Sequence, residues 1–159
     1  MKEIKLETKL IAYSAKDLPD EDIPLMNAAI DATKHSYAPY SRFHVGAAAL
    51  LANGKIVTGS NQENAAYPSG LCAERVTLFQ AGHLYPDVAV VALAIAAETN
   101  GSQVASISPC GGCRQVLLET EARAGHPVRV LLCGKDQVLI APSAASLLPV
   151  SFDGKDLPK

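Results

Sequence analysis

Three cysteines and one glutamate have the types and spacing of a metal site that carries its own proton-transfer group. Cys110 and Cys113 are separated by two residues, a spacing from which one zinc ion can take two thiolate ligands at about 2.3 Å each. Cys72 is expected to be the third ligand. The fourth cysteine, Cys133, lies in an apolar run typical of a strand interior, and the four histidines are scattered. The sequence therefore predicts a three-cysteine zinc site whose fourth position is open to water.

Glu74 follows Cys72 by two residues and is the predicted catalytic residue. It lies too close to Cys72 in a helix for the same zinc to be its natural target. A carboxylate there can take a proton from water and deliver it to a ring nitrogen and a leaving amine. Cys-x-Glu followed by Pro-Cys-x-x-Cys is typical of zinc-dependent deaminases, so the pattern predicts hydrolytic deamination. The alternative for the cysteines is a structural zinc knuckle. The alternative for Glu74 is a glutamate that only interacts favourably with the dipole at a helix N-terminus.

Three thiolates on one zinc ion leave a net negative charge, which opposes the activation of water. Both cysteine segments look like the first turns of helices, whose N-termini stabilise thiolates. Arg75 is the nearest cation in the sequence, and we expect it to hydrogen-bond the sulfur atoms of the site. Its alternative is a solvated arginine on a helix face.

The elements that must position these residues alternate between helix and strand patterns. Helices are expected from about residue 22, from 71 to 82 and from 110 to 124, where glycine and proline follow. Strands are expected at 45–51, 55–58, 88–97, 128–133 and 137–140. The run 88–97 is apolar throughout, as expected for a central strand covered on both faces. This order predicts a three-layer α/β/α fold with a five-stranded mixed sheet.

Length and charge narrow the classes of function. The 159 residues, 48% of them hydrophobic, predict a single catalytic domain over 1–159 with an N-terminal arm at 1–20. A net charge of −2 argues against a nucleic acid polymer as partner and favours a small free substrate. The charged N-terminus and the absence of a long apolar run predict no membrane association. A cluster of reduced cysteines predicts a cytoplasmic protein.

Four ordered motifs then carry a resemblance to a known family. They are Tyr-Ala-Pro-Tyr-Ser-Arg-Phe-His-Val-Gly-Ala-Ala at 37–48, Asn-Gln-Glu-Asn-Ala at 61–65, Cys-Ala-Glu-Arg at 72–75 and Ser-Pro-Cys-Gly-Gly-Cys-Arg-Gln at 108–115. Over about residues 20–153, the chain resembles the small homotetrameric cytidine deaminases. The resemblance implies hydrolysis of cytidine and 2'-deoxycytidine to uridine and 2'-deoxyuridine with release of ammonia, a reaction of pyrimidine salvage. It also implies one zinc ion per subunit and a homotetramer whose sites are shared between subunits.

The resemblance assigns substrate contacts to eight positions. Phe43 would pack on the pyrimidine, and Asn61 and Glu63, with Gln62 between them, would bind the ribose. The Ala73 amide and the Ser108 carbonyl would hold the base. Tyr67 would contact the sugar or a neighbouring subunit, and Phe152 would close the site of another subunit. Taken alone, Phe43 is more typical of a core residue and Asn61 of a turn. Phe152 is equally consistent with a tail residue that anchors on its own core.

Three other functions remain open. A deaminase of aminonucleoside antibiotics, such as blasticidin S, shares the zinc motifs, whereas the Asn-x-Glu pair favours a nucleoside. A cytidylate or deoxycytidylate deaminase would need a cationic clamp for the 5'-phosphate, and none is evident. A zinc-stabilised scaffold protein would have no use for Glu74.

Overall fold

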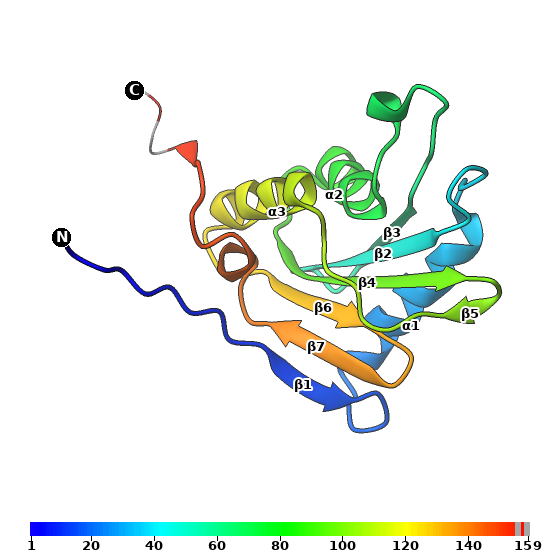
Figure 1. Cartoon of the computed structure of the whole chain (residues 1–159), viewed down its shortest axis with the longest axis horizontal. Coiled ribbons are helices and arrows are strands. Elements are labelled where there is room, and N and C mark those ends of the chain that lie inside the picture. Colours follow the sequence, from blue (N-terminus) through cyan, green and yellow to red (C-terminus); the bar gives the residue numbers. More distant parts are fainter. Residues whose placement is uncertain (155–156, 158–159) are drawn as a thin grey trace.

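The computed structural model describes residues 1–154 and residue 157, and it consists of one mixed sheet with helices on both faces (Figure 1). The strands are β1 (Ile11–Ser14), β2 (His44–Leu51), β3 (Ile56–Ser60), β4 (Val90–Thr99), β5 (Ser102–Gln103), β6 (Arg129–Cys133) and β7 (Gln137–Ala141). The α-helices are α1 (Ile23–Ala32), α2 (Ala73–Leu84) and α3 (Gly111–Ala124). Short 3₁₀ helices are η1 (Thr33–His35), η2 (Tyr67–Ser69) and η3 (Ala144–Leu147).

The apolar run predicted as a central strand is β4. It pairs antiparallel with β2 and parallel with β6, within the order β1-β7-β6-β4-β2-β3. Successive side chains of a strand point to opposite faces of the sheet. Leu93 and Ile95 accordingly pack in the core beneath α2 and α3, whereas Ala94 and Ala96 pack with residues of α1. Both faces of β4 are therefore covered, and the sequence needs no polar alternation there.

The three-layer α/β/α arrangement is confirmed, with α1 on one face of the sheet and α2 and α3 on the other (Figure 1). Helix α1 lies very close to β2 at Gly46. A Cβ atom at this position would lie 2.2 Å from the carbonyl oxygen of Ala29, so only glycine permits the contact. No helix in the described part of the chain is long and apolar enough to span a membrane.

The prediction of five strands was wrong, because the sheet has seven. The five predicted strands are present as β2, β3, β4, β6 and β7. The additional β5 forms a hairpin with β4 through Asn100 and Gly101, which have φ angles of 51° and 71°. Asn-Gly with positive φ is the signal of a two-residue hairpin turn. The additional β1 comes from the N-terminal arm and pairs with β7.

One ion pair between a buried aspartate and a partly exposed arginine ties α1 to the sheet. Both carboxylate oxygens of Asp22, which is 1% exposed, accept hydrogen bonds from the Arg129 guanidinium at 2.7 and 3.0 Å. Arg129→Met should lower the free energy of unfolding by about 1.5 to 3 kcal/mol, because it leaves a buried carboxylate without its partner. Urea titration measures this difference. Lys34→Met is the control, since it breaks only the exposed Asp31–Lys34 pair and should cost less than about 0.5 kcal/mol. Equal effects of the two variants would contradict the prediction.

Candidate metal centre and active site

The three candidate ligands lie at the N-termini of two helices. Cys72 is the N-cap residue of α2, Cys110 is the N-cap residue of α3, and Cys113 follows in the first turn of α3. Both N-cap residues have extended backbone angles, so the chain enters each helix at a cysteine. The expected helix starts are therefore confirmed. The partial positive charge of both helix N-termini acts on the same group of sulfur atoms.

The three sulfur atoms form a compact group. All lie within 4.8 Å of one another, and the Sγ atoms of Cys72 and Cys110 are 3.9 Å apart. Two thiolates on a tetrahedral zinc ion would be about 3.8 Å apart for Zn–S distances of about 2.3 Å, so the group fits zinc. Cys133 lies apart from it, buried in β6. Its exclusion from the ligand set agrees with the sequence prediction.

The proton equilibria of the cysteines point to the same conclusion. A hydrogen bond from Cys113, with further help from Arg75, lowers the pKa of Cys72 to about 5. The same hydrogen bond, together with burial, raises the pKa of Cys113. The two opposite shifts describe one proton held between two sulfur atoms that lie close together. A second thiolate at this distance requires a cation between them, which is the role that zinc would fill.

Glu74 and Arg75 flank the sulfur group from the first turn of α2. Burial raises the pKa of Glu74, which is 5% exposed, and the charge of Cys72 raises it further. Arg75 donates from Nη2 to the Sγ atom of Cys72 at 3.8 Å, as expected from the sequence. Its Nε atom is buried and has no hydrogen-bond partner among the described residues. The positive charge of the Arg75 guanidinium offsets part of the negative charge that three thiolates would carry.

A cavity of about 480 Å³ opens beside this group. It is lined by Tyr40, Ser41, Asn61, Gln62, Glu63, Asn64, Tyr67, Gly70, Leu71, Cys72 and Arg75. The cavity therefore joins one candidate ligand to four of the residues predicted to bind substrate. The loop that follows β3 contributes most of the polar lining residues, and the start of α2 contributes Cys72 and Arg75.

The side chains of Asn61 and Glu63 already hold part of the chain in place. Asn61 accepts from Ser36 Oγ at 2.6 Å and from the amide of Val45 at 2.8 Å. The carboxylate of Glu63 accepts a short hydrogen bond from the Ser41 hydroxyl, which lowers the pKa of Glu63. Asn61 and Glu63 thus both contact segment 36–45, as expected for alternate residues of an extended chain. In this structure, the side chains of Asn61 and Glu63 therefore fix the segment that borders the cavity.

The aromatic part of the cavity includes Tyr40, to which the sequence analysis gave no role. Tyr67, which is 77% exposed in η2, packs edge-on against Tyr40, with ring centroids 6.2 Å apart. Ser41 also lines the cavity and was not assigned either. Both belong to the first quoted motif, but tyrosine and serine in a loop carry no chemical signal of their own. Gln62 donates from Nε2 to Ser60 Oγ at 3.2 Å.

The remaining predicted contacts lie outside this cavity. Phe43 is half-buried, and its carbonyl accepts from Asn61 Nδ2 at 2.9 Å. Ala73 is the first residue of α2, where an amide has no acceptor within the helix. Ser108 is exposed in the loop before Cys110. Phe152 is 58% exposed, and its carbonyl accepts from Gln115 Nε2 at 2.9 Å.

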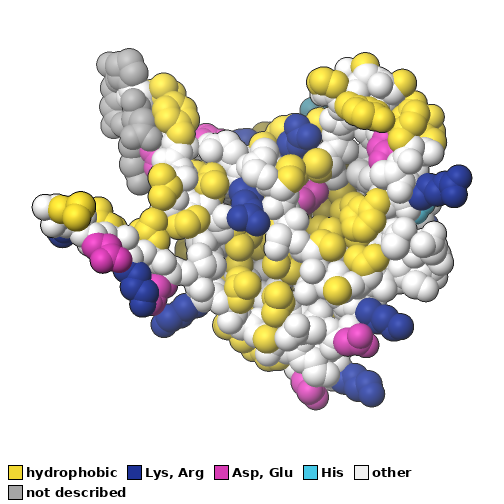
Figure 2. Space-filling view, viewed as in Figure 1, with side chains coloured by type: hydrophobic (Ala, Val, Ile, Leu, Met, Phe, Trp, Pro, Cys, Tyr) yellow, Lys and Arg dark blue, Asp and Glu magenta, His cyan; other side chains and the backbone are white. Residues whose placement is uncertain are grey.

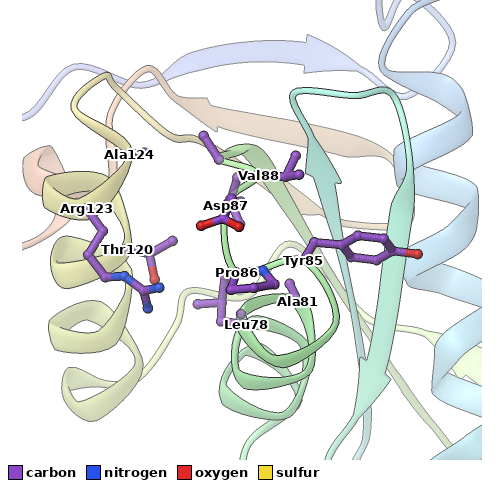
Figure 3. Close-up of a pocket in the computed structure, with 12 residues that line it drawn as sticks. Leu78, Ala81, Tyr85, Pro86, Asp87, Val88, Thr120, Arg123 and Ala124 are labelled. Carbon is purple, nitrogen blue, oxygen red and sulfur yellow. The ribbon is translucent and has the colours of Figure 1, made fainter.

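A second cavity, of about 290 Å³, lies between the ends of α2 and α3 and the loop that precedes β4. Figure 3 shows the side chains of Arg123 and Thr120 on α3 facing those of Asp87 and Pro86 across it. It contains none of the residues that the sequence predicts to act on a substrate. The cavity at Cys72 is therefore the candidate active site.

Comparison with known proteins agrees with this geometry. The zinc-binding region of cytidine and deoxycytidylate deaminases matches residues 19–125. Cytidine deaminase of Halalkalibacterium halodurans is 38% identical over 84% of this chain and 95% of its own length. Cytidine deaminase of Mycobacterium tuberculosis strain H37Rv is 40% identical over 89% of this chain and 98% of its own.

Solved structures give the same picture for the fold. The crystal structure of cytidine deaminase from Burkholderia pseudomallei superposes with a TM-score of 0.69 and 39% identity. The superposition covers 82% of this chain and 98% of that one. Because the family match at residues 19–125 includes both cysteine motifs and these relatives match most of the chain, the chain belongs to the zinc-binding cytidine deaminase family.

Proposed function

We propose that this protein hydrolyses cytidine and 2'-deoxycytidine to uridine and 2'-deoxyuridine with release of ammonia. The observation that carries the proposal is that three cysteine sulfurs from two helix starts meet beside the buried Glu74, and that one of these cysteines, Cys72, lines an open cavity. Family membership supports the same chemistry. In pyrimidine salvage, this reaction returns free cytidine to the uridine pool.

Cys72, Cys110 and Cys113 would hold one zinc ion per chain. Zinc supplies a Lewis acid that makes water a nucleophile near neutral pH. Glu74 would accept the proton of that water and pass it to N3 of the cytosine ring as water attacks C4. It would then deliver a proton to the departing amine, so that one water is consumed for each ammonia released. A carboxyl with a raised pKa is suited to both transfers, because its proton is held neither too weakly nor too strongly.

The other contacts would orient the nucleoside. The Ala73 amide and the Ser108 carbonyl would hydrogen-bond the base, and Phe43 would pack against its face. Asn61 and Glu63 would bind ribose hydroxyls, with Gln62 and Tyr67 bordering the sugar. Glu63 would then share its carboxylate between a ribose hydroxyl and the hydroxyl of Ser41.

Charge in the cavity favours a nucleoside over a nucleotide. Among the residues that line the cavity, Arg75 is the only basic one, and it contacts Cys72. A 5'-phosphate would lack the cationic partner that such groups require. This assignment is tested by comparing kcat/KM for five kinds of substrate. They are cytidine, deoxycytidine, the monophosphates of these two nucleosides, the free base cytosine, and blasticidin S. We expect the two nucleosides to be the best substrates, whereas preference for a monophosphate or for the antibiotic would contradict it.

We further propose a homotetramer in which Phe152 of one subunit closes the site of another. Phe152 is exposed on its own subunit and lies outside its own cavity, while Gln115 fixes its backbone.

Single-domain organisation over 1–159 is part of the same proposal. The cytoplasmic location and the absence of membrane and nucleic acid partners stay predictions from the sequence.

Removing the chain after Pro149 should raise KM for cytidine about tenfold while zinc stays bound, because an enclosing aromatic ring is lost. Phe152→Ala should give most of this effect, since it keeps the carbonyl that accepts from Gln115. Val150→Ala, at a neighbouring apolar residue that is also exposed, is the control and should leave KM unchanged. Light scattering checks that the assembly survives. A tetramer with unchanged KM after truncation would contradict the role of Phe152.

A further inference from the structure

The outer part of the N-terminal arm, residues 1–10, lies outside the region that matches the family, which begins at residue 19. It continues β1 as an extended segment and projects from the body of the molecule (Figure 1). Its Thr8 hydroxyl donates to the carbonyl of Ser146 at 2.8 Å. Beyond this point Ile4 is 75% exposed and Leu6 is 54% exposed. Apolar side chains of this size on an extended segment indicate a surface that another chain covers.

The arm has a strict pattern of period two. Its even positions from 4 to 10 are Ile, Leu, Thr and Leu. Its odd positions from 3 to 9 are Glu, Lys, Glu and Lys, so the sign of the charge alternates as well. In extended backbone these two sets lie on opposite faces. Figure 2 shows hydrophobic, basic and acidic side chains along the projecting arm.

This charge pattern is complementary to itself in one arrangement. When two arms run antiparallel with Leu6 opposite Leu6, Glu3 lies opposite Lys9 of the other copy. In the same register, Lys5 lies opposite Glu7, and on the other face Ile4 lies opposite Thr8. The four charges at positions 3, 5, 7 and 9 then each meet an opposite charge, and the two copies are related by a twofold axis. A parallel pair in register would instead place each charge against its like.

We propose that the arms of two copies of this chain pair antiparallel about Leu6 and join the subunits. The occupant is a second copy rather than an unrelated strand, because the register that satisfies all four charges is set by the arm's own sequence. The arm continues an edge strand, β1, whose partner on one side is β7, so the ribbon would extend an existing sheet. If the subunits already associate through their bodies, their arms meet at high effective concentration, which favours a short ribbon.

Disulfide trapping tests the register directly in the zinc-loaded protein. On the twofold axis, Leu6→Cys brings two identical residues to a Cα separation of about 4.5 to 5.5 Å, within the range of a disulfide. Leu10→Cys is the matched control, because Leu10 is similarly exposed but lies opposite Lys2. Under mild oxidation, Leu6→Cys should form disulfide-linked dimers at least about tenfold faster than Leu10→Cys. Equal rates, or no cross-link from Leu6→Cys, would overturn the proposal.

Charge variants made on the Leu6→Cys protein test the complementarity. Lys5→Glu with Lys9→Glu makes all four odd positions from 3 to 9 acidic and should abolish the cross-link. Adding Glu3→Lys and Glu7→Lys inverts the pattern, which remains complementary to itself and should restore the cross-link between identical chains. A mixture of parental and inverted arms should yield few mixed dimers. If the inverted arm does not cross-link, or the acidic arm still does, the arm docks elsewhere and the proposal is wrong.

Discussion

Replacing Glu74 by glutamine is expected to lower kcat for cytidine by about 10² to 10⁴-fold while the fold and the bound zinc are retained. An amide of the same size keeps the packing of a residue that is 5% exposed, but it cannot accept and return a proton. Steady-state kinetics together with elemental analysis of the same preparation measure both effects. Glu119→Gln, at an exposed glutamate of α3, should retain the parental rate.

A Glu74→Gln variant that turned over cytidine near the parental rate with zinc in place would remove Glu74 from the mechanism. A variant that lost zinc together with activity would instead show that the glutamate holds the metal site together. The two results separate proton transfer from site assembly, which activity alone would not do.

Cys110→Ala and Cys113→Ala are expected to release zinc and lower the melting temperature together. Metal affinity in a three-ligand site depends on each thiolate, so the zinc content should fall from one per chain to less than about a tenth, with a parallel loss of activity. Elemental analysis and thermal unfolding measure the two quantities. The loss of stability follows because zinc binds only the folded arrangement of these residues.

Cys133→Ala separates metal loss from core damage. Cys133 and Cys113 are both fully buried, so each substitution leaves a small cavity that costs some stability. Only the change at Cys113 should remove zinc. If zinc stays stoichiometric in Cys110→Ala or Cys113→Ala, that cysteine is not a ligand, and if Cys133→Ala loses zinc, the ligand set must be revised.

The sequence predicted the parts of the fold where burial dictates residue type. The apolar run of β4 was consistent only with a central strand. The Asn53-Gly54 pair was consistent only with a hairpin between β2 and β3, where Gly54 has a φ angle of 81°. Strand β5 was missed because it has only two residues. An extended arm or edge strand was expected from the alternation at the N-terminus, but it was placed too early in the chain. For β1, the alternation at residues 4–10 precedes the residues that pair, which are Ile11–Ser14.

The metal group was predictable because few arrangements explain cysteines at this spacing next to a glutamate. The substrate contacts were less predictable for a physical reason. Amide and carboxylate side chains bind backbone and hydroxyl groups as readily as a sugar, and Asn61 and Glu63 do so with segment 36–45. Phe152 illustrates the second limit, since a contact with another subunit leaves no pattern in one chain.

The central claim is hydrolytic deamination at the cysteine group, and turnover in ¹⁸O-labelled water tests it most directly. Zinc-loaded protein incubated with cytidine should release equal amounts of uridine and ammonia, with one labelled oxygen at C4 of each uridine. Formation should stop when zinc is removed by a chelator and resume when zinc is restored. The absence of uridine from fully zinc-loaded protein, or uridine that lacks the label, would contradict the account.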